Sequence, residues 1–103
     1  MDCKIFWHIR ARKDLQKLYE YISERNLSAA NKTVSQIVHK IQLLIDNPRM
    51  AAVEQSLIDL SKTYHSLIVG NYKVIYMIDD FVIAIVCIWD CRQDPAKLIK
   101  LLK

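Results

Sequence analysis

Residues 63–95 read TYHSLIVGNYKVIYMIDDFVIAIVCIWDCRQDP, and this stretch decides the fold. Two polar pairs, Gly70-Asn71 and Asp79-Asp80, interrupt its apolar runs. A two-residue polar pair with glycine first, between apolar runs, is typical of a β-hairpin turn. The stretch therefore predicts three consecutive strands joined by two tight turns.

The alternation of side chains assigns the faces of these strands. In the middle strand, side chains two apart share a face of the sheet. The last strand, from Phe81 to Trp89, is apolar on both faces, which predicts a central position in the sheet. One face of the middle strand should carry Tyr72, Val74, Tyr76 and Ile78, and the other Lys73, Ile75 and Met77.

Upstream of this sheet, the pattern predicts a first strand and two amphipathic helices. Residues 3–9 are apolar and rich in strand formers, and residues 11–25 have a helical period. Ser28 is a plausible N-cap of a second helix, which Asp46-Asn47-Pro48 should end because a residue before proline leaves the helical region. The predicted core stripes are Leu15, Leu18, Tyr19 and Ile22 in the first helix and Val34, Ile37, Val38, Ile41, Leu44 and Ile45 in the second.

The remaining segments complete an α+β fold. Residues 49–62 have no firm period, and we expect Leu57, Ile58 and Leu60 to anchor them to the core. Asp94 and Pro95 suit the N-cap and first position of a short terminal helix. The order β-α-α-β-β-β with this last helix predicts one domain, residues 1–103, with the helical hairpin packed on a mainly antiparallel, curved sheet. The apolar side of the terminal helix, which should face the core, consists of Leu98, Ile99, Leu101 and Leu102.

Composition excludes several classes of function. With one glycine in 103 residues, the chain has neither a GxSxG elbow nor a glycine-rich phosphate loop. The three histidines and three cysteines show no metal-ligand spacing, so we expect no metal or cofactor and interpret the cysteines as core thiols. We find no signal peptide and no apolar run long enough to span a bilayer, and therefore expect a cytoplasmic protein without a membrane partner.

The chain is basic, and its surplus charge lies in the first half. The formal net charge is +4, and residues 1–51 hold all of the excess. This balance is compatible with nucleic acid or with an acidic protein partner. Solvated helix faces would produce the same pattern.

Polar side chains on or beside the sheet are the candidates for chemistry. Arg92 can bind a phosphate or an acidic partner, or pair with Asp90 or Asp94. His65 can act as a general acid or base, or lie at the surface in a hydrogen bond. Lys73 can face solvent or a ligand. The full set is Tyr64, His65, Lys73, Asp90, Arg92 and Gln93.

The hairpin phrase YHSLIVGNYKVIY at residues 64–76 and the strand end IWDCRQDP at residues 88–95 resemble the RelE/ParE superfamily of type II toxins, in particular its ParE-like, plasmid-stabilisation branch. The resemblance extends upstream and so spans nearly the whole chain. The matching upstream positions are Ala11, Asp14, Leu15, Leu18, Tyr19, Tyr21 and Ile22.

The resemblance implies a growth-inhibiting toxin that a cognate antitoxin neutralises. ParE-like members inhibit DNA gyrase, whereas RelE-like members cut messenger RNA on the ribosome. The C-terminal tyrosine element of the RelE-like nucleases is missing, because residues 97–103 read KLIKLLK. We therefore favour a toxin that binds its target without catalysis; the alternatives are a ribosome-dependent endoribonuclease and a degenerate module that only binds an antitoxin.

The same resemblance suggests sites and assembly states. A nuclease would use His65, Lys73 and Arg92 as its catalytic residues. A homodimer and a toxin–antitoxin hetero-oligomer are both compatible with the family. The target-binding candidates are Tyr64, Lys73, Arg92 and Gln93. The antitoxin-binding candidates, Tyr21 and Lys17, follow from the first helix itself: Tyr19 and Tyr21 point to different faces, and Tyr19 belongs to the core stripe, so Tyr21 is left to contact a partner.

Overall fold

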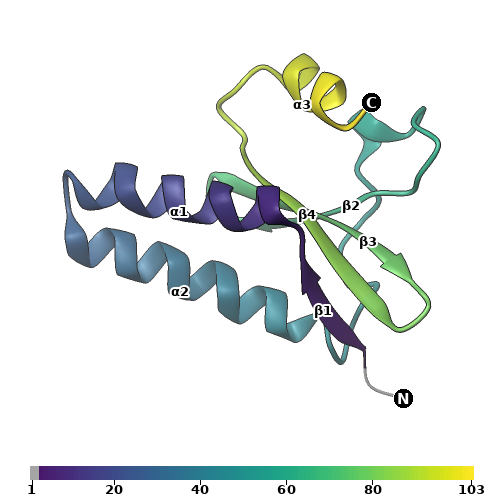
Figure 1. Ribbon diagram of the computed structural model, residues 1–103, viewed down its shortest axis with the longest axis horizontal. Coiled ribbons are helices and arrows are strands. Elements are labelled where there is room, and N and C mark those ends of the chain that lie inside the picture. Colours follow the sequence, from purple (N-terminus) through teal and green to yellow (C-terminus); the bar gives the residue numbers. More distant parts are fainter. Residues whose placement is uncertain (1–2) are drawn as a thin grey trace.

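The computed structural model of the chain describes residues 3–103 and has a helical hairpin packed on one sheet (Figure 1). The elements follow the predicted order. A short 3₁₀ helix, η1, precedes the hairpin strands. The elements are β1 (Lys4–Trp7), α1 (Ile9–Ser23), α2 (Leu27–Leu43), η1 (Gln55–Leu57), β2 (His65–Val69), β3 (Tyr72–Asp79), β4 (Val82–Asp90) and α3 (Pro95–Leu102).

The sheet has four strands in the order β1-β4-β3-β2. The pairs β2–β3 and β3–β4 are antiparallel, and β1 pairs with β4 in parallel. The last long strand therefore lies between β1 and β3, which confirms its predicted central position. The α+β fold and the mainly antiparallel sheet are confirmed as well.

Several predicted boundaries are wrong by a few residues. β1 ends at Trp7, and α1 begins at Ile9, because the His8 ring accepts a hydrogen bond from the backbone N–H of Arg10 and acts as the N-cap. Asn26, rather than Ser28, is the N-cap of α2; its side-chain oxygen accepts from the Ala29 N–H at 3.0 Å. A capping side chain can start a helix before its apolar period becomes visible.

The turns carry the positive backbone angles that two-residue hairpins require. Gly70 has φ +60°, as expected for a glycine-first turn. The second turn consists of Asp80 and Phe81, not of Asp79 and Asp80, and Asp79 is the last residue of β3. Asp80 adopts φ 52°, a conformation that aspartate tolerates better than most residues.

Strand β4 contains a β-bulge, and both faces of the sheet are covered. Ile75 pairs with Cys87 and Tyr76 with Ile85, so Val86 is an extra residue in β4. Val86 and Cys87 consequently both belong to the cluster on the face opposite to the helical hairpin. The predicted faces of β3 are confirmed, because Val74 and Tyr76 pack toward the hairpin and Ile75 and Met77 pack toward the other cluster.

The main core lies between the hairpin and the sheet. Its buried residues from the helices include Leu18, Ile37, Ile41 and Leu44, as the stripes predicted. Tyr19 is an exception, because it is half-buried and does not belong to this core cluster. Within residues 3–103, none of the helices is long and apolar enough to cross a membrane.

The second, smaller core lies under α3 and η1. Leu57 and Leu98 are buried there, and Leu60 packs against them, but Ile58 and Leu101 are exposed, contrary to expectation. Cys87 is fully buried in this core, as predicted, and its burial raises the pKa of the thiol to about 12. Cys91 is exposed, so the prediction that it is a core thiol is wrong.

Candidate functional site

A polar cleft lies where the second half of α1 passes the ends of β3 and β4. Two adjoining hollows of about 280 Å³ each form the cleft, and Tyr21 and Tyr72 line both. The sheet contributes Tyr72 and Asp90, which lie directly opposite each other because β3 begins at Tyr72 and β4 ends at Asp90. The other lining residues that matter below are Asp14, Lys17, Arg25, Asp90, Arg92 and Gln93.

Asp90 fixes the Arg92 side chain at one wall of the cleft. Asp90 Oδ1 accepts from Nε of Arg92 at 3.0 Å, and Oδ2 accepts from Nη2 at 2.8 Å. The backbone N–H of Arg92 also donates to Oδ1, at 2.9 Å. The hydrogen bonds from Arg92 lower the pKa of the Asp90 carboxyl, and the same pairing raises the pKa of Arg92. The predicted pairing of Arg92 with Asp90 is confirmed.

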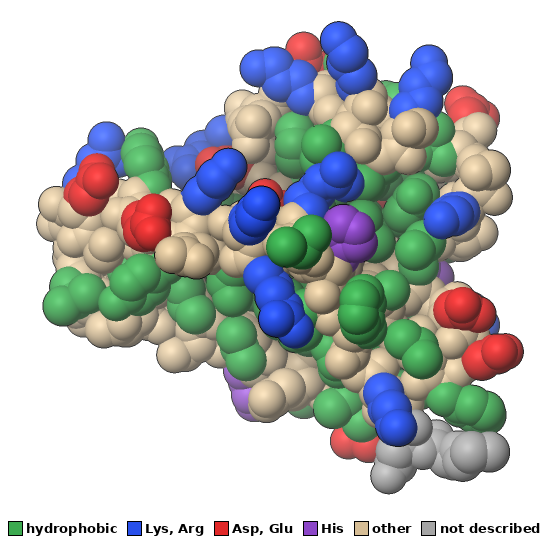
Figure 2. All heavy atoms as spheres, viewed as in Figure 1, with side chains coloured by type: hydrophobic (Ala, Val, Ile, Leu, Met, Phe, Trp, Pro, Cys, Tyr) green, Lys and Arg blue, Asp and Glu red, His purple; other side chains and the backbone are tan. Residues whose placement is uncertain are grey.

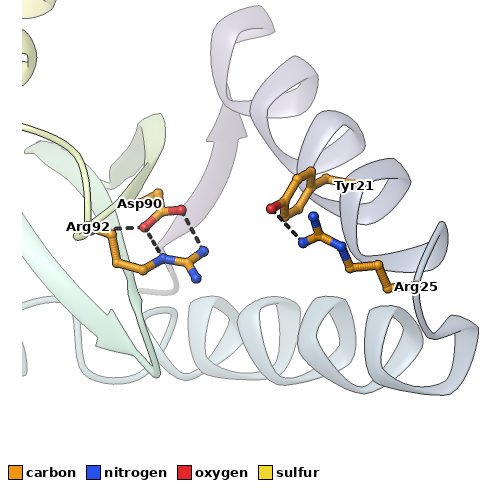
Figure 3. A network of polar contacts seen from close by, with 4 residues as sticks. All are labelled: Tyr21, Arg25, Asp90 and Arg92. Atoms are coloured by element: carbon orange, nitrogen blue, oxygen red, sulfur yellow. Dashed lines mark hydrogen bonds and ion pairs between the residues drawn. The ribbon is translucent and has the colours of Figure 1, made fainter.

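Tyr21 and Arg25 form the opposite wall. The Tyr21 hydroxyl accepts a hydrogen bond from Nη1 of Arg25 at 2.6 Å, and Cζ of Arg25 lies 4.5 Å from the centre of the Tyr21 ring. Tyr21 is 51% exposed, so this contact holds the ring without burying it. Figure 3 shows the Tyr21–Arg25 and Asp90–Arg92 pairs pointing toward each other across the cleft.

Asp14 joins α1 to β4 at the floor of the cleft. Strand β1 pairs with β4 only as far as Ile85, which leaves the next part of that edge of β4 without a strand partner. Oδ2 of Asp14 accepts from the backbone N–H of Ile88 at 3.0 Å and so satisfies a donor at this edge. Burial raises the pKa of the Asp14 carboxyl, against the lowering effect of this bond and of Arg10 and Lys17.

The side chains that line the cleft are suited to binding a polar or anionic partner. Two guanidinium groups and two phenols can recognise carboxylates, phosphates or backbone carbonyls of a partner. Burial and the Asp90 charge raise the pKa of the Tyr72 phenol, so this group stays protonated at neutral pH. The arrangement thus offers hydrogen-bond donors and cations rather than a poised base.

Lys73 lies elsewhere, on the sheet face opposite to the hairpin. Its ammonium donates to Oε1 of Glu54 at 2.8 Å, and Ser56 donates to Oε2 of the same carboxylate at 2.7 Å. Burial raises the pKa of Glu54, but the hydrogen bonds from Lys73 and Ser56 outweigh it and lower that pKa to about 2. A small hollow that includes Cys91 adjoins this pair.

His65 is a buried residue on the helix-packed face. It is 7% exposed, its ring stacks on Tyr76 with 5.2 Å between centroids, and Nδ1 lies 3.1 Å from the Ala51 carbonyl oxygen. The prediction of a hydrogen bond is confirmed, but the surface position is wrong. Tyr64, a target-binding candidate, is also buried, and it packs in the second core.

The structure therefore gathers some predicted site residues and separates others. Lys17, Tyr21, Arg92 and Gln93 meet in the cleft, although the sequence suggested two different partners for them. The three nuclease candidates do not meet. Sequence reasoning missed Arg25 and Tyr72; their only signals were the four-residue spacing from Tyr21 to Arg25 and the start of a strand at Tyr72.

A further hollow lies between α1, α2 and β1 and is mostly apolar. Its volume is about 460 Å³, and Tyr19, which the helical period assigned to the core, lines it. An apolar hollow of this kind on a surface is typical of a protein-binding groove. Its lining residues are Trp7, Arg12, Leu15, Gln16, Tyr19 and Val34.

Comparisons with known proteins agree with the fold and with the family resemblance. The profile of the family described as "ParE toxin of type II toxin-antitoxin system, parDE" matches residues 5–95. A solved structure titled "Chromosomal ParDE TA system from P. aeruginosa" is similar with a TM-score of 0.68 and 20% sequence identity; the match covers 84% of this chain and 92% of that chain. No curated protein matches the sequence.

Proposed function

Because the chain belongs to the family of ParE toxins of type II toxin-antitoxin systems, we propose that it arrests growth by binding DNA gyrase through the cleft around Tyr21 and Arg92. The target binding is not catalytic. An antitoxin neutralises the toxin by covering the same cleft. Both encounters take place in the cytoplasm.

The separation of the nuclease candidates supports a binding mechanism. Cleavage of RNA by its own 2′-hydroxyl needs a base, a cation and an acid around one phosphate. His65 is buried on the helix side, whereas Lys73 is on the other face and already neutralised by Glu54. Arg92 is at the end of β4 and bound to Asp90. No single phosphate can reach all three side chains in this arrangement.

The antitoxin surface would extend from the cleft to the apolar hollow between α1 and α2. Lys17 and Tyr21 lie on α1 at the cleft, and Tyr19 lies on the same helix at the hollow. A partner helix with an apolar face fits the hollow, and a polar continuation fits the cleft. Covering both would block the target site without any change in the toxin fold.

Two assays on the purified chain test the target. Supercoiling by gyrase should be inhibited, and messenger RNA on translating ribosomes should remain intact. Unaffected gyrase together with cut messenger RNA contradicts the proposal and favours the nuclease alternative. Harmless expression of the chain without a partner would instead point to a degenerate antitoxin-binding module.

Variants locate the target site. Arg92→Ala and Tyr21→Ala should each weaken gyrase inhibition about tenfold or more, because residues of their kinds dominate binding interfaces. Lys32→Ala, on an exposed part of α2 that lines none of the hollows described above, is the matched control and should behave like the unmodified chain. Equal inhibition by all four proteins would remove the cleft from the proposal.

A further inference from the structure

Polar and basic side chains follow one another along the exposed side of α1. A hollow of about 390 Å³ is lined by Arg10, Lys13, Asp14 and Lys17. The first cleft hollow shares Asp14 and Lys17 with it, and the second cleft hollow shares Tyr21 with the first. We call this succession of three hollows the α1 trough. The distance along the helix from Arg10 to Tyr21 is about 16 Å.

The α1 trough carries a strong excess of positive charge. Five cations line it, namely Arg10, Lys13, Lys17, Arg25 and Arg92, against the carboxylates of Asp14 and Asp90. Within residues 3–103, the first four cations form no ion pair, because the only pairs are Lys73–Glu54 and Arg92–Asp90. Figure 2 shows Lys and Arg side chains gathered over the first half of α1 and over α3, which borders the trough.

The two carboxylates in the trough are already engaged within the protein. Asp14 accepts from the Ile88 N–H, and Asp90 holds Arg92 through two side-chain hydrogen bonds. Asp14 feels the charges of Arg10 and Lys17, which lower its pKa, but this single carboxylate offsets only part of the charge of Arg10, Lys13 and Lys17. The trough therefore keeps a net positive charge, which favours an anionic partner.

We infer that the α1 trough binds a single strand of nucleic acid, with its phosphates along the cations and its bases against Tyr21 and Tyr72. This inference goes beyond the proposed binding of gyrase, because it assigns a second, nucleic-acid ligand to the same face of α1. Cations that follow a groove and aromatic rings that bases can stack on are the combination used by single-strand binders.

The interleaving of charge and rings favours nucleic acid over an acidic peptide. The Tyr21 ring is 51% exposed and lies between the Lys17 part of the trough and Arg25. Tyr72 lines the same two hollows as Tyr21, and Arg92 lines the second of them. A planar base gains from both ring faces and from the guanidinium planes, whereas a carboxylate gains only from the cations and the phenol hydroxyls.

Fluorescence anisotropy with a short fluorescein-labelled oligodeoxythymidylate, and separately with the oligouridylate of equal length, tests the inference. The unmodified chain should bind at least one of them, with an affinity that falls steeply between about 50 mM and about 200 mM salt. The arm that binds more tightly identifies DNA or RNA as the source of the strand. Poly-glutamate labelled in the same way is the competing probe.

Charge reversal and ring removal separate the two contributions. Lys17→Glu should weaken binding about tenfold and flatten the salt dependence, since one phosphate contact is lost. Tyr21→Ala should also weaken binding about tenfold, but with an unchanged salt dependence, and Tyr21→Phe should bind normally. Lys32→Glu carries the same charge change as Lys17→Glu and should weaken binding much less.

Equal losses in Lys17→Glu and Lys32→Glu, or tight binding of poly-glutamate with no binding of either oligonucleotide, would overturn the inference. The gyrase assay is read separately on the same preparations. A chain that binds the strand but leaves gyrase active contradicts the proposed function and keeps this inference. A chain that inhibits gyrase but binds neither oligonucleotide keeps the proposed function and contradicts this inference.

Discussion

The ammonium of Lys73 lies 2.8 Å from Oε1 of Glu54, and the two form an ion pair on the sheet face opposite to the helical hairpin. Glu54 is only 6% exposed and comes from the segment before η1, so the pair ties an irregular segment to β3. Breaking it would leave a carboxylate in a buried position without its cation. The main role of Lys73 is therefore structural: it neutralises the Glu54 carboxylate.

Glu54 should make the fold sensitive to acid. The pKa of Glu54 is lowered to about 2 in the folded chain, whereas an unfolded glutamate titrates near 4.5. Its stabilisation is therefore complete above pH 4.5 and is lost as the pH falls toward about 2. The lost free energy of unfolding is roughly 3 kcal/mol at most. Urea unfolding of the unmodified chain and of Glu54→Gln between these pH values measures the effect.

The Glu54→Gln variant should be less stable than the unmodified chain at neutral pH, and the two free energies of unfolding should converge in acid. The control is Glu24→Gln, at an exposed glutamate just after α1. Coincident curves for the unmodified chain and Glu54→Gln would mean that the pair with Lys73 contributes nothing to stability.

His65→Phe distinguishes packing from proton transfer. The phenyl ring preserves the stack on Tyr76, while the contact of Nδ1 with the Ala51 carbonyl is lost. We expect a loss of about 1 kcal/mol in the free energy of unfolding, with toxicity retained. Colony counts after induction, compared with thermal melting of the purified chain, measure both. A stable but harmless His65→Phe protein would support the nuclease alternative.

The strands could be predicted because their signals are local. Gly70-Asn71 marks a turn by backbone preference alone, and the alternation from Tyr72 to Ile78 assigns the faces of β3 correctly. Asp94 and Pro95 cap α3 as predicted, for the same reason. In each case the determining residues are neighbours in the chain.

The cleft could not be predicted because its parts are distant in sequence. Tyr21 lies in the last turn of α1 and Arg92 follows β4, and only the packing of α1 beside the end of β4 brings them to one hollow. The bulge at Val86 and the acceptor role of Asp14 also depend on where β1 stops. No periodicity in the sequence reports where a neighbouring strand ends.

Asp14→Ala should loosen the junction of α1 with β4. The substitution removes the acceptor of the Ile88 N–H, and the expected loss is about 1–3 kcal/mol in the free energy of unfolding. Asp14→Asn keeps a side-chain oxygen and should lose less. Amide hydrogen exchange at Ile88 gives the local readout. Unchanged protection of that amide in Asp14→Ala would show that the bond does not hold the strand edge.

Arg92→Ala should abolish toxicity while the fold survives. Arg92 is exposed and its contacts are with Asp90, so melting of the purified variant should change little. Arg92→Lys keeps the charge but loses the bidentate geometry, and should retain only part of the toxicity. Asp90→Asn releases the guanidinium and is the matched control for its orientation. Growth after induction and the melting temperature are measured for all three. Full toxicity in Arg92→Ala would exclude the cleft as the target site. If Lys73→Met instead melts normally and is not toxic, the target site lies on the opposite face of the sheet.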